Sequence, residues 1–140
     1  MMVRGGVMFH RFNKRYIDME QKKQTKKRIT ELYHFMGDAK MQKLKDDEKI
    51  ALIKLLRTMK PIAVEVMDAL HEAADKAAES YPDDAEKAAE ITNGAMEDVW
   101  HAEADIDIRV LSHDTIERLA LSNDWTFSLI DELEEEFCKP

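Results

Sequence analysis

Residues 47–79 read DEKIALIKLLRTMKPIAVEVMDALHEAADKAAE, and this stretch decides the fold. Apolar residues recur in it at alternating steps of four and three, which is the spacing of one face of an α-helix. Asp46 and Asp47 suit an N-cap and a first helical turn, so the pattern predicts a long helix over 47–79. The apolar row consists of Leu52, Leu56, Met59, Ala63, Val66, Leu70, Ala73 and Ala77.

Pro61 lies inside this predicted helix. Proline has no amide hydrogen to donate, and its ring crowds the carbonyl of Arg57, so the helix must kink or restart there. Because the apolar row keeps its phase on both sides of Pro61, we predict a kink.

A second helix is predicted after a short turn. Residues 80–84, SYPDD, have turn composition, and Asp83 or Asp84 can cap the helix that follows. Apolar spacing then continues toward Ile106 through Ala85, Ala89, Thr92, Met96 and Val99. Asn93-Gly94 either interrupts this helix briefly or leaves it intact. The turn is short, so we expect a long antiparallel helical hairpin over about 46–109, kinked near Pro61.

Shorter helices are predicted on both sides of the hairpin. Residues 1–12 form an irregular lead, and a basic N-terminal helix is expected from about Lys14 to Met36, with Ile29, Leu32, Tyr33 and Met36 on its apolar face. Two short C-terminal helices are expected over about 112–137. The first is capped by Ser112 and the second by Ser122, Asn123 or Asp124, with Trp125, Leu129, Ile130, Leu133 and Phe137 turned inward. These elements predict an all-α protein with a single helical domain over 13–140; Met19 is a possible start of a shorter natural form.

Composition narrows the class of protein. The chain of 140 residues is 44% hydrophobic, which allows a real core, and has only four glycines and three prolines. It has neither a run of about 20 apolar residues nor the apolar segment of a secretory signal. Its one cysteine, Cys138, has no partner within the chain and is predicted to be an unimportant thiol near the end. We therefore expect a cytoplasmic protein, or one inside a viral particle, that does not enter membranes.

Charge is distributed unevenly along the chain. Residues 1–60 hold 16 Lys/Arg and 7 Asp/Glu, a net charge of +9, whereas residues 61–140 hold 5 and 22, a net charge of −17. Such a division suggests a charged partner or self-association through opposite charges.

Two groups of residues carry this division. A basic arm, suited to an anionic partner, consists of Arg11, Lys14, Arg15, Lys22, Lys23, Lys26, Lys27 and Arg28. An acidic stripe follows helical steps on the two hairpin helices and consists of Glu65, Asp68, Glu72, Asp75, Glu79, Glu86, Glu90 and Glu97. The stripe is either a solvated outer face or the binding site of something basic: the arm of the same chain or of a neighbouring copy, or a separate protein whose nucleic-acid site it imitates.

Catalytic motifs are missing from the sequence. It contains no glycine-rich phosphate loop, nucleophile elbow or paired-cysteine motif, so we expect no catalytic residues and no cofactor. Glu-x-x-His spacing, as in di-iron helical bundles, occurs once at Glu31–His34, and Asp68–His71 is a variant of it. Glu97 and His101 are four residues apart. His34, His71 and His101 more simply flank apolar rows, so we predict no metal site.

Residues 112–137, SHDTIERLALSNDWTFSLIDELEEEF, have the outline of a helix-turn-helix, with Asp124 where a glycine is preferred. The second helix carries five carboxylates and no cation, and the nearest cation upstream is Arg118. A recognition helix lies against phosphates and base edges, so this charge argues against DNA reading. Any contact with nucleic acid is expected through the basic arm alone.

The hairpin that opens with KLKDDEKIALIKLLRTMKPIAVEVMDAL (43–70), together with the closing LALSNDWTFSLIDELEEEF (119–137), resembles the short helical accessory and assembly proteins of tailed bacteriophages and prophages. The resemblance implies an interaction role in particle assembly. A helix of 33 residues is about 50 Å long, which is long for a monomer of this size, so we expect a homodimer or higher oligomer. The sequence predicts a non-catalytic interaction or assembly protein; the alternatives are an acidic nucleic-acid mimic and a regulator that binds DNA through the arm.

Overall fold

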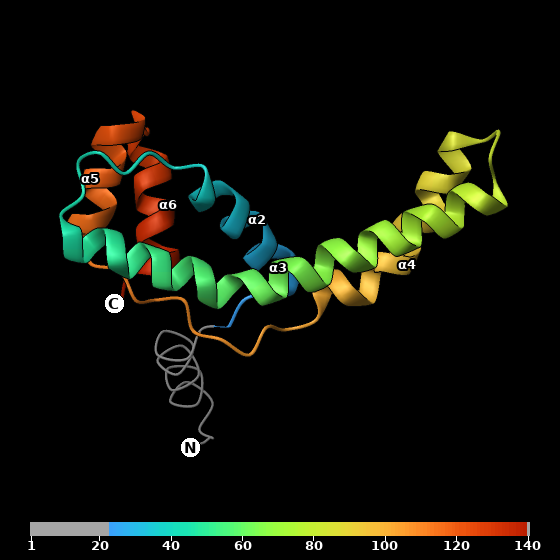
Figure 1. The fold of residues 1–140 in the computed structure, drawn as a ribbon, viewed down its shortest axis with the longest axis horizontal. Helices are drawn as coiled ribbons and strands as arrows, with labels where there is room; N and C mark the ends of the chain where they lie inside the picture. The colour runs from blue at the N-terminus through green and yellow to red at the C-terminus, as the bar shows by residue number, and fades with distance from the viewer. Residues whose placement is uncertain (1–22, 140) are drawn as a thin grey trace, which may run out of the picture. The chain divides into compact units, whose positions relative to one another are not determined.

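The structure is a computed structural model, which describes residues 23–139 of the chain. Within these residues the protein is all-α and has five helices, which confirms the predicted fold class (Figure 1). The helices are α2 (Lys26–Gly37), α3 (Asp46–Ser80), α4 (Ala85–His101), α5 (His113–Asn123) and α6 (Phe127–Phe137).

The described residues form two compact units. The α2–α4 unit comprises residues 24–39 and 52–106, and the α5–α6 unit comprises, of the described residues, 23, 40–51 and 107–139. Helix α3 belongs to both, because its first residues, 46–51, lie in the α5–α6 unit and the remainder lies in the α2–α4 unit.

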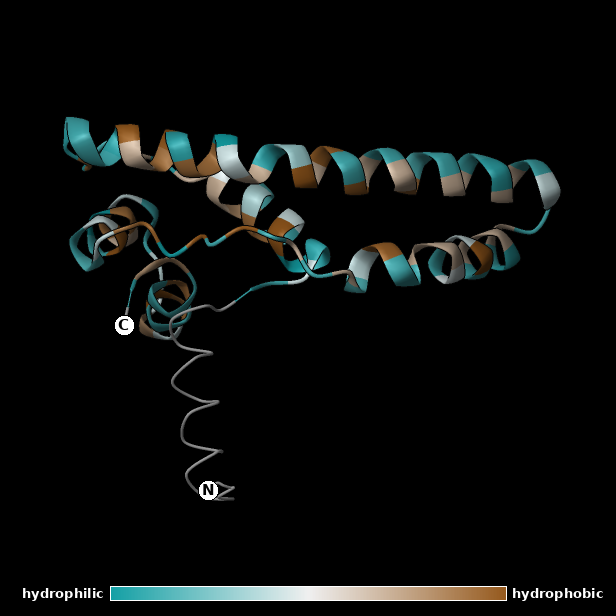
Figure 2. Cartoon of the chain, turned by 90° about the horizontal axis from the view of Figure 1, so that it is seen from below, coloured by the Kyte–Doolittle hydropathy of each residue, from teal (hydrophilic) through white to brown (hydrophobic). Residues whose placement is uncertain are grey.

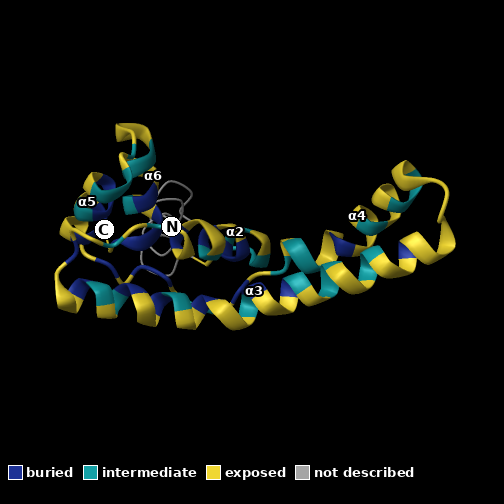
Figure 3. Cartoon of the chain, turned by 45° about the horizontal axis from the view of Figure 1, so that its top comes forward, coloured by how far each residue is buried: buried dark blue, intermediate teal, exposed yellow. Residues whose placement is uncertain are grey.

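Helix α3 runs without interruption from Asp46 to Ser80, with Pro61 inside it. Its buried apolar residues are Leu52, Leu55, Met59, Ala63, Val66 and Ala77, and Figure 3 shows this buried line along the helix. The predicted row is confirmed at five of its eight positions, while Leu56, Leu70 and Ala73 are half-buried and Leu55 is buried in place of Leu56. Helix α2 also packs against α3. The buried face of α3 is therefore broader than a face that contacts one helix alone.

Helix α2 packs against α3 as a helical hairpin, with Lys26 at the start of α2 reaching Glu65 of α3. Ile29, Leu32 and Met36 are buried, as their spacing predicts. The helix begins at Lys26, whereas the predicted helix begins near Lys14. Residues 14–22 of that predicted helix lie outside the described residues.

The late start of α2 has a local cause. The Thr25 hydroxyl accepts a hydrogen bond from the Arg28 amide at 3.2 Å and so caps the helix. Before it, Gln24 and Thr25 are extended and pair with residues 102–104. The Lys26 amide donates to the Ala102 carbonyl and the Ala104 amide donates to the Gln24 carbonyl, both at 2.8 Å. A backbone held in this extended pairing is not available to continue a helix.

Helices α3 and α4 are joined by residues 81–84 and run in opposite directions (Figure 2). The Asp84 carboxylate caps α4 by accepting from the Lys87 amide at 3.0 Å, which is one of the two predicted caps. Helix α4 passes through Asn93-Gly94 unbroken but ends at His101, short of the predicted end near 109. It ends there because the next residues are extended and pair with Gln24–Lys26.

The α5–α6 unit has a small core that includes Ile116, Leu119, Leu133, Phe137 and Cys138. Ser112 caps α5, as predicted. The predicted cap of α6 was wrong: Thr126 caps it, because Ser122 and Asn123 still belong to α5. Asp124 ends α5 with φ of 58°, in the left-handed region. Of the five predicted anchors, Leu133 and Phe137 are buried and Trp125, Leu129 and Ile130 are half-buried.

Candidate acidic interaction surface

The basic arm is described in its last part only. Arg11, Lys14, Arg15 and Lys22 lie outside the described residues, and Lys23 is exposed just before α2. The three cations at the start of α2 all contact neighbours within the α2–α4 unit, as the following distances show. Lys26 Nζ lies 2.7 Å from Glu65 Oε2, Lys27 Nζ lies 5.4 Å from the Trp100 ring centre, and Arg28 lies 3.7 Å from Glu31.

The acidic stripe forms two separate rows. The α3 row consists of Glu65, Asp68, Glu72, Asp75 and Glu79, and the α4 row consists of Glu86, Glu90 and Glu97; all eight side chains are exposed. A helix turns by about 100° per residue, which places each row roughly 150° around its helix from the middle of that helix's buried and half-buried residues. The rows therefore lie on the outer sides of α3 and α4 and do not merge into one face.

Only some of these carboxylates have a cation beside them. Glu65 pairs with Lys26 of α2, which partly joins the basic arm to the stripe. The pairs within one helix are Lys76–Glu72 at 3.0 Å, Lys87–Glu90 at 4.0 Å and His101–Glu97 at 3.4 Å. Four members make no ion pair with any described residue: Asp68, Asp75, Glu79 and Glu86. Exposed pairs of this kind contribute about 0–1 kcal/mol each, so they offset little of the repulsion within a row.

The candidate metal-binding side chains stay apart. His34, His71 and His101 lie on α2, α3 and α4 and are all exposed. His34 stacks edge-on against Tyr33, and His101 Nδ1 lies 2.9 Å from the Glu97 carbonyl oxygen of its own helix. In the described part of the chain, no three His, Cys, Asp or Glu side chains are grouped closely enough to hold a metal ion.

Glu48 is a buried carboxylate that the sequence analysis did not single out. It accepts hydrogen bonds from the Lys45 amide at 2.9 Å and from the Thr115 hydroxyl at 3.2 Å, and it lies 3.1 Å from Arg118 Nε. The Lys45 contact is half of a capping box, whose signal is a Glu at the third position of a helix. Arg118, the nearest cation upstream of α6 in sequence, is thus paired within the α5–α6 unit, which adds to the argument against DNA reading there.

An open hollow of about 530 Å³ lies in the α5–α6 unit and is lined by Arg109, Val110, Leu111, Ser112, His113 and Lys139. Two of its cationic groups have carboxylate partners. Arg109 Nε lies 3.1 Å from Asp107, which helps to lower the pKa of that carboxyl although its partial burial acts in the opposite direction. His113 Nδ1 lies 2.7 Å from Glu134 Oε2, and this hydrogen bond raises the pKa of His113.

Cys138 is predicted to be an unimportant thiol near the end, and the structure places it in the core. It is 4% exposed, and its amide donates to the Glu134 carbonyl at 2.9 Å. Burial raises the pKa of the thiol to about 11, so it is protonated and unreactive near neutral pH.

No protein-family model, curated protein or solved structure matches this chain. Among the described residues, none of the helices is long and apolar enough to span a lipid bilayer.

Proposed function

We propose that the protein is a non-catalytic interaction protein whose acidic rows on α3 and α4 bind a basic partner. The observation that supports this most is the set of four exposed carboxylates, Asp68, Asp75, Glu79 and Glu86, that have no cation beside them among residues 23–139. Carboxylates spaced three or four apart on one helix destabilise it by a few tenths of a kcal/mol per pair. A bound cationic partner would relieve this repulsion, as expected of an assembly protein.

The test distinguishes peptide binding by the acidic rows from attraction by the overall negative charge of the protein. A fluorescent oligo-lysine peptide is titrated at about 0.1 M salt with the wild-type protein and with Glu86→Gln/Glu90→Gln/Glu97→Gln, which neutralises the α4 row. We expect the row variant to bind at least about fivefold more weakly, because adjacent charges act together on one peptide and are screened beyond about 10 Å.

The matched control removes the same charge elsewhere. Asp98→Asn/Asp131→Asn/Glu135→Gln changes three exposed carboxylates that lie off both rows. It should bind within about twofold of the wild-type protein, since only the general field of the protein changes. Equal losses in the two variants would mean that net charge alone attracts the peptide, and the proposal would be abandoned.

A second candidate function is an acidic decoy for a nucleic-acid-binding protein, and the arrangement of the two carboxylate rows on outer helix faces favours it. Such a decoy would displace random-sequence duplex DNA from a basic DNA-binding protein, and the α4 row variant would lose this activity. DNA binding through the basic arm has less support, because Lys26, Lys27 and Arg28 already contact Glu65, Trp100 and Glu31.

A further inference from the structure

A second row of side chains follows the outer face of α3 between residues 53 and 78. Its members are three or four residues apart and lie roughly 130° around the helix from the buried row. All are exposed except Met67, which is half-buried, and Ile53 and Val64 are large apolar residues that are 38% and 44% exposed. We call the surface formed by this row the outer face of α3. It consists of Ile53, Arg57, Lys60, Val64, Met67, His71, Asp75 and Ala78.

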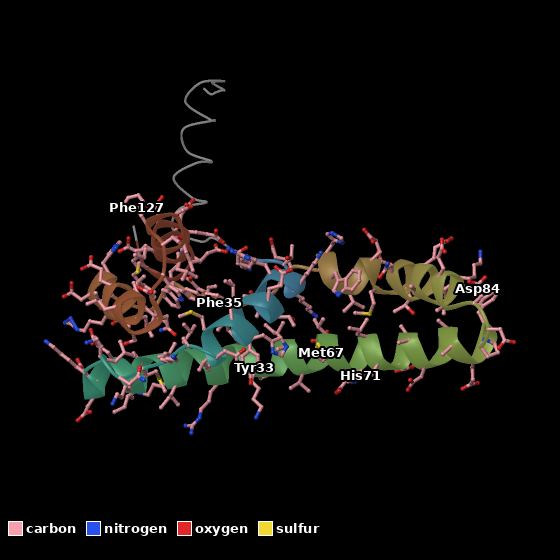
Figure 4. The ribbon with its side chains drawn as sticks, turned by 90° about the horizontal axis from the view of Figure 1, so that it is seen from above. Tyr33, Phe35, Met67, His71, Asp84 and Phe127 are labelled. Atoms are coloured by element: carbon pink, nitrogen blue, oxygen red, sulfur yellow. The ribbon has the colours of Figure 1, made fainter. Side chains whose placement is uncertain are left out.

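Charge along this face changes sign around an apolar centre. Among the members of the face, Arg57 and Lys60 lie before the centre and Asp75 lies after it. At the edge of the face, Lys54 adds to the basic segment and Glu72 and Glu79 add to the acidic segment, and the Asp68 carboxylate borders the centre. In Figure 4, side chains on the side of α3 away from α4 end in nitrogen over the first part of the helix and in oxygen farther along.

Several of these charges are available to a partner. Arg57, Lys60 and Asp75 make no ion pair with any other residue that the structure describes. Within residues 23–139, Glu72 is paired only with Lys76, one turn along the same exposed helix surface, at 3.0 Å.

The spacing of the charges is symmetric about Val64 and Met67. At about 1.5 Å per residue, the cations are centred about 13 Å before the midpoint of these two residues and the carboxylates about 15 Å after it. In an antiparallel pair related by a two-fold axis at that midpoint, the basic segment of each copy meets the acidic segment of the other. Arg57 and Lys60 then come within reach of the acidic segment of the second copy, while the two apolar centres meet at the axis.

We propose that the outer face of α3 pairs with the outer face of a second copy, antiparallel, about a two-fold axis between Val64 and Met67. Self-complementarity is what an isologous interface requires, and this face has it in both charge and apolar content. Parallel pairing would oppose like charges along the whole helix, and a polyanion such as nucleic acid would be repelled by the acidic segment.

This inference is independent of the proposed function. The dimer covers part of the α3 row, whereas the α4 row lies on the outer side of another helix and stays open to a basic partner. Binding of the oligo-lysine peptide through the α4 row can therefore persist when dimerisation fails, and dimerisation can persist when peptide binding fails.

Sedimentation equilibrium of the full chain over a wide concentration range tests the pairing. We expect a monomer–dimer equilibrium for the wild-type protein. Arg57→Glu/Lys60→Glu and Glu72→Lys/Asp75→Lys should each weaken the dimer at least about tenfold, because each reversal places like charges opposite one another at both ends of the interface. Val64→Asp should do the same by placing a charge at the apolar centre.

Two recoveries test the pairing, and the second of them identifies its antiparallel geometry. Mixing the two charge-reversed proteins should restore a heterodimer, since each then offers what the other lacks. Combining all four reversals in one chain should restore a homodimer, which parallel pairing does not predict. Lys40→Glu/Lys43→Glu is the control: it reverses two exposed cations outside α3 and should leave the dimer unchanged.

Three outcomes would overturn the proposal: a wild-type protein that is monomeric at every concentration, a dimer that resists all face variants, or four reversals that fail to restore association. Circular dichroism confirms that each variant keeps its helix content, so that loss of folding is not mistaken for loss of pairing. The peptide titration on the same samples shows whether the acidic rows still bind when the dimer is lost.

Discussion

At the scale of a single residue, Asp124 shows how one backbone angle shapes the α5–α6 turn. Its φ of 58° lies in the left-handed region, where a Cβ is unfavourable and glycine is the usual occupant. The sequence marked this position as a departure from the helix-turn-helix pattern, and the structure keeps the backbone conformation that the missing glycine would adopt. The departure is therefore in the side chain and not in the path of the chain.

Replacing Asp124 with glycine should stabilise the protein. Removing the Cβ relieves the left-handed strain, and the gain, after the greater freedom of glycine in the unfolded chain, should be about 0.5–1 kcal/mol. Urea denaturation followed by circular dichroism measures it. Asp38→Gly is the matched control, because Asp38 ends α2 with φ of −91° and has no such strain; glycine there should stabilise nothing, and an equal gain at both sites would refute the argument.

At the scale of the elements, a small set of contacts joins the start of α5 to the last turn of α6. The Leu111 amide donates to the Phe137 carbonyl at 2.9 Å, and His113 Nδ1 lies 2.7 Å from Glu134 Oε2. Glu117 and the backbone of Lys139 also favour the protonated form of His113, so its pKa is raised in the folded state. A group whose pKa is raised on folding stabilises the fold most below its unfolded pKa, about 6.5, and this contribution fades as pH rises through the folded pKa.

Removing this contact should therefore matter more in acid. The melting temperature of His113→Gln should fall below that of the wild-type protein by a few degrees at most near pH 5.5, and the two should converge near pH 8.5. Differential scanning fluorimetry at both pH values gives the comparison. His34→Gln, which changes an exposed histidine on α2, serves as the control. A deficit for His113→Gln that is constant with pH would show that protonation has no part in the contact.

Elements with a strong local signal were predictable from the sequence, and those fixed by distant partners were not. The periodicity of α3, its passage through Pro61, the Asp84 cap and the Ser112 cap depend on neighbours in the chain, and all are present. The kink at Pro61 stays a prediction. The start of α2 was wrong because Gln24–Thr25 pairs with residues some 80 positions away, for which no local pattern exists.

The cap of α6 failed for the same reason. Asn123 looks like an N-cap in sequence, yet its amide nitrogen donates to the Lys40 carbonyl at 2.9 Å and its oxygen accepts from the Lys40 amide at 2.8 Å. These contacts hold Asn123 at the end of α5. The acidic rows could be placed on their helices from spacing alone, whereas their separation onto two outer sides required the buried faces of α3 and α4 to be known.

At the scale of the whole molecule, net charge is the dominant property. Both compact units are acidic: the α2–α4 unit has 8 Lys/Arg and 15 Asp/Glu, and the described α5–α6 unit has 8 and 12. Each unit therefore repels itself at neutral pH, and few of the ion pairs described above are buried enough to compensate.

Added salt should stabilise the protein for this reason. Raising sodium chloride from about 0.02 M to about 0.3 M shortens the screening length from roughly 20 Å to roughly 6 Å, which weakens the repulsion more than it weakens contacts at 3 Å. We expect the melting temperature, followed by circular dichroism, to rise. A fall would mean that attractive pairs dominate the electrostatics. Choline chloride as a second salt controls for specific binding of sodium.

The burial of Cys138 has a practical consequence for studying the molecule. A thiol that is 4% exposed, with a pKa of about 11, will react slowly with maleimides while the fold is intact. A cysteine introduced on an exposed helix face will react first, so a single dye or spin label can be attached without replacing the native thiol. Distances between labels on two copies then become measurable in an otherwise unaltered chain.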